Sequence, residues 1–300
     1  MNLTESILRY RQYLKRRNLA PHTIKNYLHR LRQFAVWAVV PMESITPQDV
    51  KGYVDVLLEK NLSAQTINAH IIAIRSYYDF LENEEKLSLP NPAVKRLALR
   101  LPKPLPQHLR DSDVEELLKV IEKARDKALF MLMLRCGLRV EEVAQLTLGT
   151  IDYQHNQIMI KSGKGAKDRV AYISNDAAEA LAAYLRKRPK TKVQQVFLVE
   201  KGRYKGAPIS VRGIQKRIEY YSKKSGIAVS CHRLRHTMAT QLLNADADLV
   251  TIQDLLGHNR IETTQRYSKL SNLKAQRDYY KAMDTIMEKT ERNILTKKTH

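Results

Sequence analysis

The chain has 300 residues, 43% of them hydrophobic and 28% charged, so it is long enough for about two soluble domains with a core each. No apolar run approaches about 18 residues and the N-terminus has no apolar signal core, which argues against a membrane span or secretion and favours the cytoplasm. Two cysteines without paired spacing argue against a disulfide framework or a cysteine-based zinc site, while a formal net charge of +21 indicates a polyanionic partner.

The positive charges are segregated along the chain. Up to residue 42 the only acid is Glu5, against eight lysines and arginines, and residues 86–110 contain no acid. A merely solubilising surface would interleave the two signs, and their fields would cancel. Segregated charges build a field along one surface, which favours nucleic acid as the partner.

Residues 1–90 are predicted to form a bundle of four amphipathic helices. Pro21 lies in the first turn of the second helix, Thr46 caps the third with Pro47 in its first turn, and Ser63 caps the fourth. Apolar side chains recur at helical spacing and should face the core. They are Ile7, Tyr10, Leu14, Ile24, Leu28, Leu31, Phe34, Ala35, Ile67, Ile71, Ile74, Tyr78 and Leu81.

A proline-rich basic segment at residues 91–110 is predicted to be an extended linker. Its closely spaced prolines remove backbone donors and disfavour helix. A second domain is expected at residues 111–285. The polar tail at residues 286–300 is expected to be disordered.

The second domain is predicted to be mostly helical with one small antiparallel sheet. A helical pattern runs from Asp111 to Leu146, and two β-rich stretches follow at residues 157–161 and 169–173. Further helices are expected at residues 175–188, 210–225, 232–244, 249–256 and 262–270. The predicted fold class is therefore mainly α.

Four short stretches of this domain contain side chains suited to phosphate chemistry. They are Cys136–Glu142, Ser162–Arg169, His232–Thr237, and Leu255–His258 followed nine positions later by Tyr267. Each also has an ordinary interpretation when taken alone.

Arg139 follows Gly137 at the start of a new helix, where free N–H groups favour an anion and a guanidinium can fork onto phosphate. The alternative is a salt bridge to Glu142. Lys164 lies between two glycines in a hairpin loop, where it could donate a proton or contact a phosphate, although such sequences are common at hairpin tips.

His232 and Arg235 are three apart and share one helix face, which combines a proton acceptor with a phosphate clamp. Taken alone, a histidine here is more often a helix cap or a buried structural residue. His258 after Gly257 could be a C-terminal cap, and Tyr267 is one of 15 tyrosines.

The chain order of these residues resembles the tyrosine recombinase (integrase) family, most closely its Xer-type and transposon- or phage-encoded members. The N-terminal helices are similar to that family's core-binding, SAM-like domain, so the resemblance extends over nearly the whole chain. It implies a C-shaped clamp on duplex DNA. It also implies a homo-tetramer on two recombination sites, monomeric or weakly associated off DNA.

The resemblance assigns catalytic roles to Arg139, Lys164, His232, Arg235, His258 and Tyr267. Two arginines would clamp the non-bridging oxygens while Tyr267 attacks phosphorus to form a 3′-phosphotyrosine. Lys164 would protonate the leaving 5′ oxygen, His232 would help deprotonate the phenol, and His258 would hydrogen-bond the phosphate. No cofactor, metal or ATP is implied.

Departures from the family pattern are small and touch no reacting group. Met238 replaces a common aromatic, Ser268 a common threonine and Ala171 a frequent proline. Glu142 matches the acidic residue that supports the first arginine. The tail after residue 270 is expected to dock on a neighbouring protomer, the alternative being packing on its own domain.

Two other functions compete with a recombinase. A type IB topoisomerase shares the nucleophile and its helpers, but the N-terminal bundle argues against it. A DNA-binding regulator with a degenerate catalytic domain predicts a missing catalytic residue, and none is missing. The sequence leaves open the target DNA, any accessory protein, and whether the reaction is integration, excision, cointegrate resolution or dimer resolution.

Overall fold

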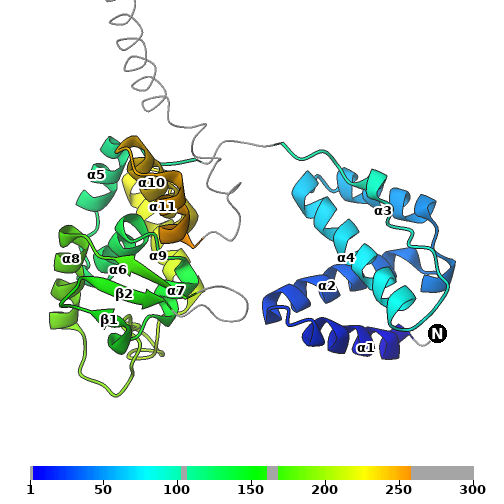
Figure 1. Cartoon of the computed structure of the whole chain (residues 1–300), viewed down its shortest axis with the longest axis horizontal. Helices are drawn as coiled ribbons and strands as arrows, with labels where there is room; N and C mark the ends of the chain where they lie inside the picture. The colour runs from blue at the N-terminus through cyan, green and yellow to red at the C-terminus, as the bar shows by residue number, and fades with distance from the viewer. Residues whose placement is uncertain (1–2, 103–106, 161–167, 258–300) are drawn as a thin grey trace, which may run out of the picture. The chain divides into compact units, whose positions relative to one another are not determined.

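The computed structural model describes residues 3–102, 107–160 and 168–257. The chain divides into two compact units, Met1–Lys103 and Pro104–His300. Both units are mainly helical, and one small sheet lies in the second (Figure 1). The predicted fold class is confirmed.

The first unit contains α1 (Leu3–Arg16), α2 (Pro21–Ala38), α3 (Pro47–Glu59) and α4 (Ala64–Asn83). The predicted helix starts are confirmed. Thr46 and Asp49 form a capping box, with the Thr46 N–H donating to Asp49 Oδ2 at 2.7 Å, and the Ser63 hydroxyl accepts from the Thr66 N–H. The apolar side chains predicted to face inward are all buried or packed against the core of this unit.

Part of the predicted linker at residues 91–110 packs on the first unit. The Asn68 amide pairs with the backbone of Leu99 in both directions at 2.8 Å, and Arg75 Nε donates to the Ala93 carbonyl at 2.7 Å. A 3-10 turn spans Lys95–Leu97. Because polar side chains of α4 pair with its backbone, this stretch is not a freely extended tether.

Val39 ends α2 in a left-handed conformation, with φ at 57° and an 86% exposed side chain. A β-branched residue is strained there, whereas glycine is not. We expect Val39→Gly to raise the free energy of unfolding by about 1 kcal/mol. Urea titration followed by fluorescence of Trp37, the chain's only tryptophan, measures it.

Val36 is the matched control, because it is 71% exposed but lies within the same helix. Val36→Gly should lower stability by roughly 0.5 kcal/mol, since glycine is the weaker helix former. If both substitutions destabilise, Val39 is not strained.

The second unit contains α5 (Asp111–Lys119), α6 (Ala124–Arg135), α7 (Val140–Gln145), α8 (Asn175–Lys187), α9 (Val211–Ser225), α10 (Cys231–Asn244) and α11 (Leu249–Leu256). The helical pattern predicted between residues 111 and 146 is thus three helices. The last break contains Gly137, whose φ of 63° ends the regular backbone.

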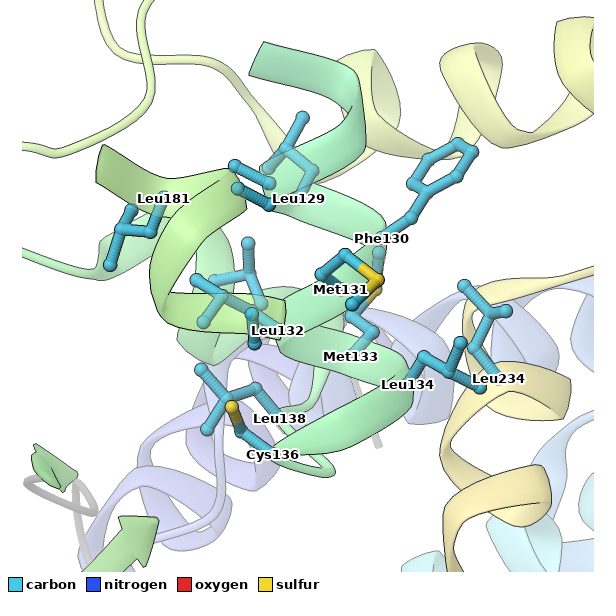
Figure 2. Packing of buried hydrophobic residues seen from close by; sticks show 14 of the residues in the cluster. Leu129, Phe130, Met131, Leu132, Met133, Leu134, Cys136, Leu138, Leu181 and Leu234 are labelled. Atoms are coloured by element: carbon cyan, nitrogen blue, oxygen red, sulfur yellow. The ribbon is translucent and has the colours of Figure 1, made fainter. Parts of the chain in front are cut away.

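Helix α6 is the centre of this unit's core. Residues Ala128 to Leu134 are all buried, so this part of the helix is apolar on every side, as expected of a helix surrounded by protein. Figure 2 shows Leu181 of α8 and Leu234 of α10 on opposite sides of it.

The small sheet is antiparallel in the order β1-β2-β3, formed by β1 (Ile151–Asp152), β2 (Gln157–Ile160) and β3 (Arg169–Tyr172). Ile160 pairs with Arg169. The two-residue strand β1 was not predicted, because two residues carry no readable alternation. The helix predicted at residues 262–270 lies outside the described residues. In the described part of the chain, no helix combines the length and apolar character needed to span a membrane.

Candidate active site

Three of the six predicted catalytic residues line one cavity of about 570 Å³ in the second unit. Arg139 comes from the start of α7, and His232 and Arg235 come from the first turns of α10. Residues of α9 form another wall, among them Arg212 and Gln215. Lys164, His258 and Tyr267 lie outside the described residues.

The cap of α10 sets the orientation of His232 and Arg235. The Ser230 hydroxyl accepts the Arg233 N–H at 3.2 Å, so the helix begins at Cys231. His232 in the first turn is only partly buried, whereas Arg235, one turn later, is 3% exposed. Arg235 Nη1 donates to the Gly137 carbonyl and Nη2 to the Leu256 carbonyl, which fixes its guanidinium.

Glu142 holds Arg139 at the start of α7. Its Oε2 accepts the Arg139 backbone N–H at 2.7 Å, and its Oε1 accepts from Arg139 Nη1 at 2.9 Å. The salt bridge considered as an alternative interpretation is therefore present. It does not consume the guanidinium, because a guanidinium has five N–H donors and 39% of the Arg139 side chain is exposed.

Arg169 is a further member of this cluster that the sequence did not reveal. Its guanidinium forks onto Glu142, with Nη1 to Oε1 at 2.7 Å and Nη2 to Oε2 at 2.9 Å, and its side chain is 7% exposed. A signal was available, because Arg169 and the buried Ala171 alternate onto one face of β3. An arginine on a buried strand face needs buried hydrogen-bond partners, and an acid is the strongest of them.

The three arginines converge on the C-terminal end of α11. Arg169 Nε donates to the Leu255 carbonyl at 3.1 Å, and Arg139 Nη2 donates to the Gly257 carbonyl at 2.8 Å. The carbonyl between them, that of Leu256, accepts from Arg235. The last carbonyls of a helix lack intrahelical partners and carry its negative dipole, so guanidinium groups stabilise them.

Gly137 packs against α10 and the end of α11. A Cβ there would meet Met238 Sδ at 2.6 Å and Leu256 Cδ2 at 3.0 Å, and φ is positive. We therefore expect Gly137→Ala to cost about 2 kcal/mol of unfolding free energy, from overpacking and backbone strain. Thermal unfolding followed by circular dichroism measures it.

Gly149 is the control for this substitution. No atom lies within 4 Å of a Cβ built there and its φ is not positive, so Gly149→Ala should leave the melting temperature nearly unchanged. A neutral Gly137→Ala would show that Met238 and the backbone relax without cost.

The protonation states fit an anion site with one neutral base. Burial would raise the pKa of the Glu142 carboxyl, but Arg169, and then Arg139, outweigh it and lower the pKa to about 2. Partial burial, together with Arg235 and Arg139, lowers the pKa of His232, so the imidazole is neutral at pH 7. Burial raises the pKa of the Cys231 thiol to about 11, which keeps it protonated.

Cations and a neutral imidazole facing one cavity can bind a phosphodiester and accept a proton. Within residues 3–102, 107–160 and 168–257, no three metal-ligating side chains gather into a candidate metal site.

Two family models match the chain. The phage integrase family matches residues 107–274, and the N-terminal SAM-like domain of phage integrases matches residues 7–85. The chain is 31% identical to the tyrosine recombinase XerA of Thermococcus kodakarensis over 290 residues, which covers 94% of this chain and 98% of that protein. It is 32% identical to the tyrosine recombinase XerC of Halalkalibacterium halodurans over 286 residues, covering 90% and 93%.

Solved structures agree in fold. A crystal structure of XerA recombinase matches with 28% identity and a TM-score of 0.54, covering 93% of this chain and 98% of that one. The Tn1549 transposon integrase in complex with transposon right end DNA matches with 19% identity and a TM-score of 0.75, covering 93% and 99%. The chain belongs to the phage integrase family and is a Xer-like tyrosine recombinase.

Proposed function

We propose that this enzyme cleaves and rejoins duplex DNA at specific sites through a covalent 3′-phosphotyrosine at Tyr267, without metal or ATP. The observation that carries the proposal is the convergence of Arg139, Arg235 and His232 on one cavity. Two cations and a neutral base there match the requirements of phosphodiester transesterification.

In the proposed reaction Arg139 and Arg235 bind the non-bridging oxygens of the scissile phosphate, where negative charge grows in the transition state. The Tyr267 oxygen forms a bond to phosphorus as the bond to the 5′ oxygen breaks. Lys164 gives its proton to that oxygen, and His258 donates a hydrogen bond to the phosphate. Religation reverses these steps with a 5′ hydroxyl of the partner strand, so no external energy source is needed.

His232 is proposed to accept the phenol proton. Partial burial and two nearby arginines lower its pKa, so it enters the reaction neutral at pH 7. Histidine exchanges protons efficiently near this pH. The His236 ring lies edge-on to it at 4.5 Å between centroids, which restricts the orientation of the imidazole.

The proposed partner is double-stranded DNA carrying two recombination sites, bound by a homo-tetramer inside the cytoplasm, at the nucleoid. The net charge of +21 supports a polyanionic partner. XerH bound to palindromic difH substrate is one DNA complex with this fold, at a TM-score of 0.70.

The test begins with the DNA. Rounds of binding to randomised duplexes identify a preferred site, and a nick near its centre turns it into a suicide substrate. The full chain should then form a denaturant-resistant protein–DNA complex at the 3′ end in the presence of EDTA. Absence of that complex on every nick position would overturn the proposal.

A relaxation assay separates the proposal from a topoisomerase. Supercoiled plasmid lacking the selected site should remain supercoiled, whereas a plasmid with two sites should give recombinant products. Relaxation without the site and without recombinants would support a type IB topoisomerase instead.

A further inference from the structure

Arg169 connects three segments of the second unit with one guanidinium. It begins β3, both Nη atoms bind Glu142 of α7, and its Nε binds the Leu255 carbonyl at the end of α11. Its aliphatic stem also lies against Gly257, where an added Cβ would be 2.9 Å from Arg169 Cδ. These contacts enclose the Arg169 side chain between β3, α7 and the end of α11.

Glu142 transmits this arrangement to Arg139. Each Glu142 oxygen accepts one bond from Arg169 and one from Arg139, so the carboxylate lies between two cations. Without Arg169, the buried carboxylate would lose its forked partner, and burial would favour its protonated form. A protonated Glu142 holds Arg139 less firmly.

The Arg169 guanidinium also contacts the C-terminal end of α11. Arg169 and Arg139 hold the carbonyls of Leu255 and Gly257, and His258 is the next residue in the sequence. Lys164 stands five positions before Arg169. Arg169 is thus linked through Glu142 to Arg139, and its stem contacts Gly257, the residue before His258.

We propose that Arg169 is a positioning residue of this recombinase: through Glu142 and the end of α11 it fixes Arg139 in the geometry that the scissile phosphate requires. The inference rests on the proposed function. Arg169 contacts no substrate in this role. Displacements of about 1 Å in a catalytic group can reduce rates by about 100-fold.

Arg125 provides a matched control. Its side chain is 6% exposed, its Nε and Nη2 both donate to Asp126 Oδ1 at 2.9 and 2.8 Å, and its Nη1 donates to the Leu198 carbonyl at 3.0 Å. It has the same burial and the same kinds of partner as Arg169. Its acid partner Asp126 binds Arg217 and Tyr221, whereas Glu142, the acid partner of Arg169, binds Arg139.

The experiment compares Arg169→Met, Arg169→Lys and Arg125→Met in single-turnover cleavage of the selected nicked duplex at saturating protein. Arg169→Met should form the covalent complex about 100-fold more slowly than wild type with DNA affinity within about threefold. Arg169→Lys should lose about tenfold, because it keeps the charge but not the fork. Arg125→Met should stay within about threefold per folded molecule.

Two readouts separate positioning from general support of the fold. The acid limb of the cleavage rate should move to higher pH in Arg169→Met, because the pKa of Glu142 rises. Arg169→Met should slow cleavage less in a Glu142→Gln background than in wild type, since part of its effect passes through Glu142. If Arg169→Met fails to fold, Arg169→Lys tests the proposal through the same two readouts.

Equal slowing by Arg169→Met and Arg125→Met, or cleavage by both Arg169 variants within threefold of wild type, would overturn this inference alone, because wild type still forms the covalent complex. No complex with wild type would overturn the proposed function and this inference together.

Discussion

Tyr267→Phe is expected to abolish the covalent protein–DNA complex while leaving DNA binding within about threefold of wild type. The substitution removes one oxygen, the proposed nucleophile. The Cys231 thiol lines the cavity, but burial raises its pKa to about 11, so it is protonated at pH 7. Denaturing electrophoresis of the reaction with the nicked duplex measures the complex.

Tyr204→Phe is the control, since Tyr204 lies in the same unit with 68% of its surface exposed. It should cleave like wild type. A covalent complex that persists in Tyr267→Phe would mean that another residue is the nucleophile, and peptide mapping of the linked DNA would identify it.

Much of the fold was predictable because local signals agree with the tertiary structure. Thr46 with Pro47 marks the start of α3, and periodic apolar residues of α1, α2 and α4 form the first core. Helix α6 shows the limit. A helix buried on all sides has no polar face, so periodicity alone could not separate α5, α6 and α7. The left-handed Gly137 makes the break before α7.

The site was predictable as a set of residues but not as a network. Chain order singled out Arg139, His232 and Arg235, and the cavity brings these three together. Arg169 was not identified, because its partner Glu142 is 27 residues away and the carbonyls it shares with the other arginines are backbone groups. Backbone acceptors at a helix end leave no mark in the identity of the residues.

Arg139→Ala is expected to lower the single-turnover cleavage rate about a thousand-fold while the protein stays folded. The chemical effect follows because one of two proposed phosphate clamps is removed. Stability survives because Glu142 keeps its fork to Arg169 at 2.7 and 2.9 Å, so the carboxylate is not left unpaired. Rapid-quench cleavage and thermal unfolding measure the two effects.

Arg135→Ala is the matched control, with a side chain 33% exposed against 39% for Arg139 and with an acid partner, Asp176, at 2.9 Å. It should cleave within about threefold of wild type.

Arg235→Ala should lose both activity and stability, because the 3% exposed guanidinium holds the Gly137 and Leu256 carbonyls. Wild-type cleavage by Arg139→Ala would remove it from the phosphate clamp. Unfolding of Arg139→Ala would instead show that Arg169 alone cannot hold Glu142. Together these variants separate the chemical role of each arginine from its structural role.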